Sequence, residues 1–238
     1  MKTFYYKRTI LYYQRIEIPD FFINLDNYYD QNCQNLKDAY LKYGLKYPEN
    51  ILKRYADIKF FSNLIRREYY ENKNPFEASL LINTYLVGYF NSLKSFLDAV
   101  AVTLNDTLNL GLKPIDRDLC RKRIWTLLPT DIKIKYEKYK IVFKSINDYR
   151  NAASHRFYPI IIVRCPSSVR LNRTPSQISR EEVDIMLVDN PENDTNILFD
   201  RENIKWENPI LLMEDLNKKI QEIANLIIDD FIKAFFLK

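Results

Sequence analysis

Residues 74–111 read NPFEASLLINTYLVGYFNSLKSFLDAVAVTLNDTLNLG. Large apolar side chains recur here every three or four residues, which is the spacing of one face of an α-helix. They are Ile82, Leu86, Tyr89, Leu93, Phe96, Val100 and Leu104. Asn74 and Pro75 suit the N-cap and the first helical position, and Gly111 lies just beyond the last turn. The stretch predicts one long buried helix that ends near Asn109, and hence a mainly α fold.

Five further segments show helical periodicity, and several have recognisable start signals. The segments are 24–43, 49–71, 114–128, 131–155 and 209–236. Pro48 precedes one of them, and the last starts at the pair Asn208-Pro209. Thr130 or Asp131 is expected to cap the helix that runs to about His155. Three glycines in 238 residues, with 47% apolar residues, are typical of packed helices.

The periodicity changes to a strand-like pattern in two places. Residues 3–18 predict one strand or two short ones, within an extended N-terminal segment that covers residues 1–20. Residues 157–163, 183–188 and 197–199 predict three more short strands, so we interpret residues 156–208 as a small β-rich, basic insertion between the last two helices. The expected fold is a single helical domain over residues 1–238 that carries this insertion.

The composition argues against several classes of function. Neither GxxxxGK[ST] nor GxGxxG occurs, so P-loop nucleotide hydrolysis and dinucleotide redox chemistry are not expected. Cys33, Cys120 and Cys165 are far apart, and one histidine cannot complete a Cys/His zinc site, so we expect no metal and no cofactor. The N-terminus does not resemble a signal peptide and no stretch is apolar enough to span a membrane. A reduced, cytoplasmic location without membrane contact is expected.

The end of the helix predicted at 131–155 reads Arg150-Asn151-Ala152-Ala153-Ser154-His155 and contains the only histidine of the chain. Histidine is the side chain best suited to proton transfer near neutral pH. Asn151 is four residues before His155 and Asp148 is seven before it, so these three share one edge of the helix. Arg150 lies about 140° around the axis from His155, but its side chain is long enough to reach that edge.

This run begins a stretch in which arginine is concentrated. Residues 150–180 contain six arginines and no Asp, Glu or Lys. The rest of the chain contains the other 30 of the 36 basic residues and all 31 acidic residues, so its charge is nearly balanced. The arginines are Arg150, Arg156, Arg164, Arg170, Arg173 and Arg180. Such a run indicates either a phosphate-binding patch or a solvated loop. Its position beside the single histidine favours the patch.

The sequence R-N-A-A-S-H resembles the R-x4-6-H motif of HEPN domains, most often R-N-x-x-x-H. HEPN domains are bundles of about four or five helices, common in prokaryotic defence and toxin–antitoxin systems, with the motif near the end of a late helix. The resemblance covers residues 49–155 and the C-terminal helix, and does not account for the N-terminal segment or the insertion. It implies a HEPN-like bundle and a metal-independent endoribonuclease, with the motifs of two chains lining one cleft.

The resemblance also implies roles for individual residues. Arg150 would stabilise the phosphate and the transition state, His155 would act as general acid or base, and Asn151 would orient His155 or bind phosphate. Asp148 is added as a supporting residue from helix geometry alone, and Arg156, Arg170 and Arg173 are expected to bind RNA. With one histidine per chain, a mechanism that uses two histidines requires a homodimer. A toxin or antiviral effector also needs an antitoxin or regulatory partner.

Two other interpretations stay open. The chain can be a non-catalytic HEPN-like module that binds RNA or nucleotides, or that dimerises. It can also be a helical interaction protein unrelated to HEPN domains, in which Arg150 and His155 are held separately in structural contacts. The intact R-N-x-x-x-H motif favours the ribonuclease, because a scaffold does not need it.

Overall fold

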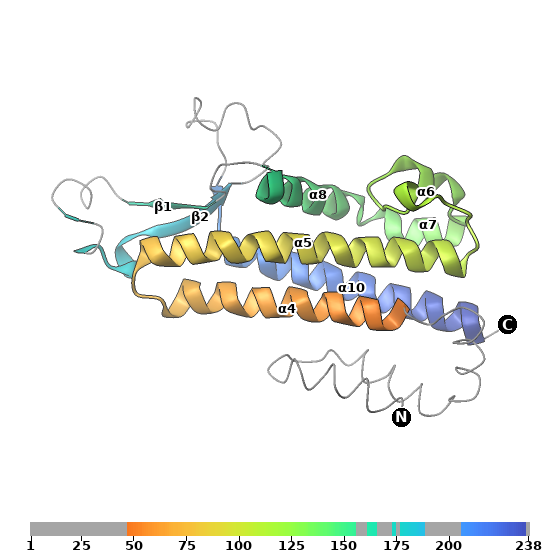
Figure 1. Cartoon of the computed structure of the whole chain (residues 1–238), viewed down its shortest axis with the longest axis horizontal. Coiled ribbons are helices and arrows are strands. Elements are labelled where there is room, and N and C mark those ends of the chain that lie inside the picture. The colour runs from red at the N-terminus through yellow and green to blue at the C-terminus, as the bar shows by residue number, and fades with distance from the viewer. Residues whose placement is uncertain (1–46, 156–160, 166–172, 175–176, 189–205, 237–238) are drawn as a thin grey trace. The chain divides into compact units, whose positions relative to one another are not determined.

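The structure, a computed structural model, describes residues 47–155, 161–165, 173–174, 177–188 and 206–236. Within these ranges the chain is mainly helical, as predicted, with six α-helices and a small three-stranded antiparallel sheet (Figure 1). The helix expected at 24–43, the extended segment expected at 1–20 and the strand expected at 197–199 lie outside the described residues.

Most helices lie close to their predicted positions. They are α4 (Tyr47–Glu71), α5 (Pro75–Thr107), α6 (Lys122–Leu127), α7 (Thr130–Glu137), α8 (Lys140–His155) and α10 (Pro209–Phe236). The short helix expected within 114–128 consists of two pieces, because a 3-10 turn, η1 (Pro114–Asp116), precedes α6. Among the described residues, none of these helices is both long and apolar enough to cross a membrane.

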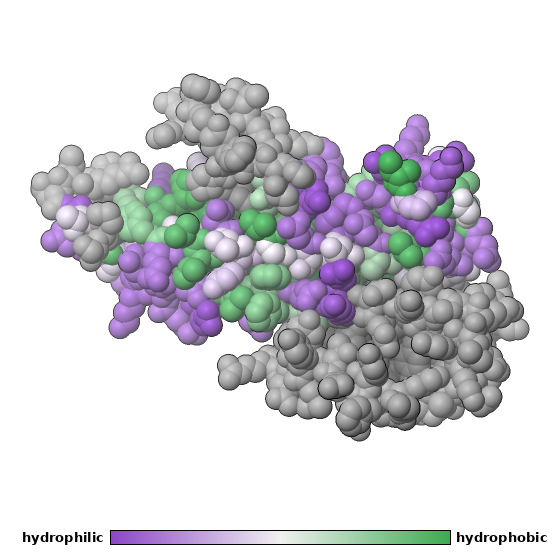
Figure 2. Space-filling view, in the orientation of Figure 1, coloured by the Kyte–Doolittle hydropathy of each residue, from purple (hydrophilic) through white to green (hydrophobic). Residues whose placement is uncertain are grey.

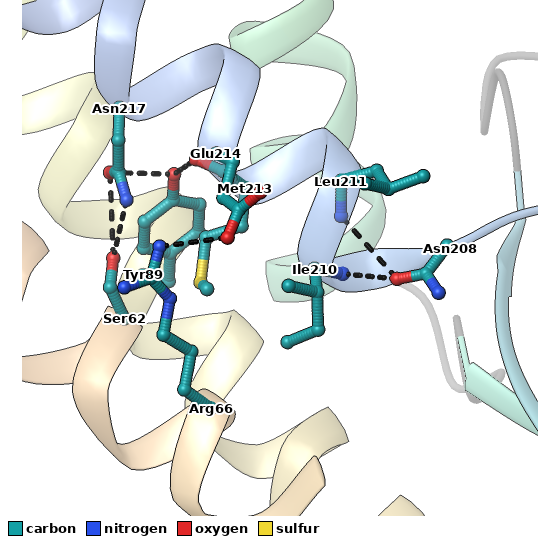
Figure 3. Close-up of polar contacts among 9 residues, drawn as sticks. All are labelled: Ser62, Arg66, Tyr89, Asn208, Ile210, Leu211, Met213, Glu214 and Asn217. Atoms are coloured by element: carbon teal, nitrogen blue, oxygen red, sulfur yellow. Dashed lines mark hydrogen bonds and ion pairs between the residues drawn. The ribbon is translucent and has the colours of Figure 1, made fainter. Parts of the chain in front are cut away.

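The two asparagine–proline starts are confirmed in detail. The backbone N–H groups of Phe76 and Glu77 donate to Asn74 Oδ1 at 3.1 and 3.2 Å. At the start of α10, the N–H groups of Ile210 and Leu211 donate to Asn208 Oδ1 at 2.8 and 3.4 Å (Figure 3). Each asparagine therefore satisfies N–H groups that have no partner inside the first helical turn.

The prediction of one continuous helix over 131–155 is wrong. α7 ends at Glu137 and α8 begins at Lys140. Between them, the N–H of Tyr139 donates to the carbonyl of Tyr136 at 3.0 Å, a three-residue step that tightens the turn and interrupts the α-helix. The expected cap is also wrong: Pro129 occupies the N-cap position with an extended backbone and no side-chain hydrogen bond, so neither Thr130 nor Asp131 caps α7.

The chain divides into two compact units, and α4, α5, α8 and α10 contribute residues to both. The first unit contains the described residues of 47–57, 92–143 and 218–236, and the second those of 58–91 and 144–217. Buried side chains of the first unit include Phe96, Val100, Trp125, Tyr136, Phe143 and Ile223, and those of the second include Ile65, Leu86, Tyr89, Ile146, Ile185 and Met213. A single domain over residues 1–238 stays a prediction.

The predicted β-rich insertion between the last two helices is confirmed as a sheet in the order β1-β2-β3. The strands are β1 (Ile161–Arg164), β2 (Asp184–Val188) and β3 (Trp206–Glu207), with a 3-10 turn, η3 (Arg180–Glu182), before β2. β1 lies antiparallel to β2, with Ile161 opposite Leu187, and β3 lies on the other side of β2, with Glu207 opposite Leu187. Ile161, Ile185 and Leu187 form the buried face.

Two features of the second unit fix how α4, α5 and α10 pack. Asn217 of α10 donates through Nδ2 to Ser62 Oγ of α4 at 3.0 Å, and Tyr89 of α5 donates its hydroxyl to Asn217 Oδ1 at 3.1 Å (Figure 3). All three residues are buried. Gly88 of α5 faces Phe61 of α4 so closely that a Cβ atom on Gly88 would lie 2.3 Å from the phenyl ring. The buried polar groups and the close fit of the Phe61 ring against Gly88 both specify one helix register.

Candidate functional site

The part of α8 that carries the motif is held in place by Tyr149. Its ring stacks on Phe90 of α5, with ring centroids 4.8 Å apart and planes 6° from parallel. Its hydroxyl donates to the carboxylate of Glu207 in β3. Ile146 and Ala152, one turn before and after Tyr149, are buried on the same side of α8. These contacts fix the rotation of α8 about its own axis, and hence the direction of the neighbouring polar residues.

Arg150 and Asn151 are brought together beside this anchor. Arg150 Nη1 donates to Asn151 Oδ1 at 3.1 Å, and both residues are half-buried. Asp148 is half-buried on the same edge of α8 as Asn151. His155 is the last residue of α8, one turn after Asn151, and its side chain lies outside the described part of the structure. The arginine therefore bends from its own side of the helix toward the edge that Asn151 and His155 share.

This arrangement suits a group that carries negative charge. The guanidinium is a planar donor that matches phosphate oxygens, and it is held near the C-terminus of α8, where the helix dipole favours positive charge. Because Oδ1 of Asn151 accepts from Arg150, the Nδ2 amide group is the part of Asn151 that can donate to a phosphate or to an imidazole. The pair thus presents two donors one turn before the single histidine.

The arginines of the insertion divide between structural and exposed positions. Arg180 donates through Nε to the carbonyl of Tyr69 at 3.3 Å and through Nη1 to the carbonyl of Val183 at 2.9 Å, and it lies 4.5 Å from the centre of the Tyr69 ring. Arg173, predicted to bind RNA, forms an ion pair with Glu182 at 2.7 Å. Arg164 is exposed at the end of β1. Arg156 and Arg170, also predicted to bind RNA, lie outside the described residues.

Sequence reasoning missed what Arg173 and Arg180 contact. Glu182 lies two residues after Arg180 and forms a capping box with Ser179, so its side chain is already positioned to accept from Arg173. Hydrogen bonding from the Ser179 backbone and from Arg173 lowers the pKa of Glu182. The acidic pair Glu181-Glu182, immediately after Arg180, was the available signal.

The described residues include two of the three cysteines. Burial, together with the charge of Asp118, raises the pKa of the Cys120 thiol to about 12, which leaves little thiolate near neutral pH. Cys120 and Cys165 are free thiols, and Cys33 lies outside the described chain. Among the described residues, no three His, Cys, Asp or Glu side chains are grouped closely enough to hold a metal ion.

Comparison with known proteins assigns no family. The chain matches no protein-family model, no curated protein and no solved structure.

Proposed function

We propose that this chain is a metal-independent endoribonuclease whose site is built from Arg150, Asn151 and His155 at the end of α8. The observation that supports the proposal best is the hydrogen bond from Arg150 to Asn151, one helical turn before the only histidine. The resemblance of this segment to the HEPN motif supports the same chemistry. Asp148, on the edge that Asn151 shares, is the supporting residue.

RNA cleavage of this kind needs a base, an acid and a positive charge. The 2′-oxygen attacks the adjacent phosphorus while a base takes its proton. The bond from phosphorus to the 5′-oxygen breaks while an acid donates a proton to that oxygen. The products are a 2′,3′-cyclic phosphate and a 5′-hydroxyl end. Arg150 stabilises the charge on the phosphorane oxygens, and imidazoles supply the base and the acid.

A homodimer follows from the number of histidines. One chain has one imidazole, so a site whose base and acid are both imidazoles needs His155 from each of two chains. A role as a toxin or antiviral effector in the cytoplasm belongs to the same proposal. Such an enzyme needs an antitoxin or another inhibitory partner, because free ribonuclease activity damages the cell that makes it.

The first test is cleavage of total RNA by the purified chain in EDTA, with His155→Ala beside the wild type. We expect the wild type to cleave and the variant to be inactive, because the variant lacks the proton-transferring group. Equal cleavage by both proteins would reject His155 as part of the site. RNA binding without cleavage by the wild type would instead favour a non-catalytic RNA-binding or dimerisation module.

Arg150→Lys tests the arginine separately. Lysine keeps the charge but lacks the planar fork of donors, so we expect kcat to fall by roughly 100-fold or more. Arg54→Lys, on the exposed surface of α4, is the matched control and should leave the rate unchanged. A rate for Arg150→Lys equal to that of the control would contradict a role for the guanidinium in the transition state.

A further inference from the structure

A second basic region lies in the first unit, in residues 113–143. This segment contains nine lysines and arginines and four aspartates and glutamates, an excess of five positive charges that equals the net charge of the entire chain. Positive and negative charges are nearly balanced outside residues 150–180 only because acidic residues elsewhere offset this strongly basic segment. Unlike the insertion, every residue of this segment is described by the structure.

Two of the four carboxylates in this segment are engaged by lysines. Glu137 pairs with Lys140 at 2.7 Å, and Asp118 pairs with Lys94 of α5 at 3.2 Å. Asp116 and Asp131 offset part of the remaining charge, and Lys135 pairs with Asp230 of α10. Three consecutive cations at the start of α6 are exposed, Arg121, Lys122 and Arg123, and Lys138 is exposed after α7. We call residues 113–143 the α6–α7 surface.

Buried contacts hold this surface together. The indole N–H of Trp125 donates to the carbonyl of Leu119 at 2.8 Å, and its ring stacks on Phe143 of α8 with centroids 6.2 Å apart. Lys140 Nζ lies 4.5 Å from the centre of the same indole ring. α6 therefore packs against the first turn of α8, and this packing fixes the position of the backbone that carries its exposed cations.

Exposed aliphatic side chains lie in the same segment. Leu127 is 38% exposed, Ile134 is 66% exposed and Ile141 is 83% exposed. Figure 2 shows apolar side chains among the hydrophilic ones over α6 and α7. Single exposed aliphatic side chains are common on protein surfaces, but here two isoleucines that are more than half exposed lie in the same segment as the exposed cations. Single-stranded nucleic acid offers partners for both kinds of side chain, because its phosphates attract cations and its unstacked bases present flat apolar faces, which a duplex hides.

We propose that the α6–α7 surface binds single-stranded RNA. Arg121, Lys122 and Arg123 contact backbone phosphates, and Ile134 and Ile141 cover the faces of bases. Binding at this surface requires no catalysis by Arg150 or His155. It rests on the proposed function only in the choice of RNA over DNA.

The test is the affinity of the full chain for a labelled 2′-O-methyl oligouridine of about 20 nucleotides, measured by fluorescence anisotropy between about 50 and about 200 mM salt. A 2′-O-methyl strand lacks the attacking hydroxyl, so failure of the ribonuclease proposal leaves this measurement unaffected. The variant R121Q/K122Q/R123Q should bind roughly tenfold more weakly, and the slope of log affinity against log salt should fall by about 2, since each phosphate contact on a single strand contributes about 0.7.

The matched control is K53Q/R54Q/K73Q, which removes the same charge from exposed positions of α4 and its end. It should bind like the wild type. A second variant, I134S/I141S, should weaken binding without changing the salt slope, because the contacts that it removes are not ionic.

Equal loss of affinity in the two triple variants, or no binding by the wild type, would overturn the proposal. So would tighter binding of duplex RNA, or binding of vesicles that contain anionic lipid in place of RNA. Equal affinity for oligodeoxythymidine would overturn the choice of RNA.

Discussion

Asn217 uses both ends of its side-chain amide inside the second unit. Its Oδ1 accepts from Tyr89 and its Nδ2 donates to Ser62, whose hydroxyl in turn donates to the carbonyl of Ile58 at 2.8 Å. The Tyr89 hydroxyl also lies 3.2 Å from the carbonyl of Met213. Removing this one amide leaves two buried hydroxyl groups with fewer partners. The free-energy cost of leaving a buried polar group unsatisfied is larger than the net stabilisation that its hydrogen bond had provided.

We predict that Asn217→Leu lowers the free energy of unfolding by about 2–4 kcal/mol, measured by urea titration. Asn225→Ala, at an exposed position of α10, should change it by less than about 0.5 kcal/mol. The variant S62A/Y89F/N217L removes every side-chain member of the cluster and should regain most of the loss. If Asn217→Leu and Asn225→Ala unfolded at similar urea concentrations, the cluster would add no stability.

The contact between Arg150 and Asn151 illustrates what the sequence cannot specify for a single residue. Helix periodicity places Asp148, Asn151 and His155 on one edge and Arg150 well away from it. The side-chain conformation that returns the guanidinium to Asn151 depends on the space left by Tyr149 and its neighbours. Residue types and helical positions were therefore predictable, whereas the pairing required the packed structure.

At the scale of elements, α4 and α5 pack closely where Gly88 faces Phe61. Alanine favours a helix over glycine by about 1 kcal/mol, so Gly88→Ala should stabilise α5 if the helix were alone. In the folded chain the added methyl group would overlap the phenyl ring. We predict a net destabilisation of about 1–3 kcal/mol by urea titration.

The double variant F61L/G88A provides the control for this prediction. Leucine is smaller than phenylalanine and leaves space for the new methyl group, so the double variant should be more stable than Gly88→Ala alone. Simple addition of the two single-variant effects would mean that the two side chains do not interfere.

Elements were predictable where a local signal marks them. Asn74-Pro75 and Asn208-Pro209 combine a side-chain acceptor with a residue that needs no N–H partner, and the helices begin there. The break after Glu137 has no such signal, because the apolar spacing of Tyr136, Tyr139 and Phe143 continues through it. β3 has only two residues, too few for any periodic pattern to identify.

At the scale of the whole molecule, acid stability depends in part on Asp118. Burial raises the pKa of its carboxyl, but the N–H of Cys120 and the ammonium of Lys94 outweigh burial, and the pKa is lowered overall. A carboxyl whose pKa is lower in the folded chain adds stability above its unfolded pKa of about 3.9. That contribution is lost as the pH falls through the lower, folded value.

We predict that Asp118→Asn lowers the free energy of unfolding by roughly 1 kcal/mol at pH 7, a small value because Asp118 is partly accessible to solvent. The difference from the wild type should shrink below about pH 4, where the wild-type carboxyl also loses its charge. Thermal melts across this pH range measure it. Asp116→Asn removes the same charge two residues away, and an identical pH profile for both variants would rule out a specific contribution from the Lys94 pair.

The net charge of the whole chain does not show where unpaired positive charge lies on the molecule. The concentration of arginine at 150–180 was visible in the sequence, but two of the described arginines there have structural partners, Glu182 and Tyr69. The excess at 113–143 was hidden by acidic residues elsewhere, and only the exposure of Arg121, Lys122 and Arg123 distinguishes it from a balanced surface. Charge becomes informative once the structure shows which cations are already paired.

The contact of Arg180 with Tyr69 has a consequence for any attempt to shorten the chain. Tyr69 lies in the last turn of α4. Backbone carbonyls in the last turn of a helix lack the helical hydrogen bond from the N–H group four residues later in the chain. Arg180 supplies a donor to one of them from the insertion, which makes the insertion part of the α4 terminus. Excising residues 161–207 to obtain a bare bundle would remove that donor. A minimal bundle would therefore need a new cap designed for α4 as well as a new loop to join α8 to α10.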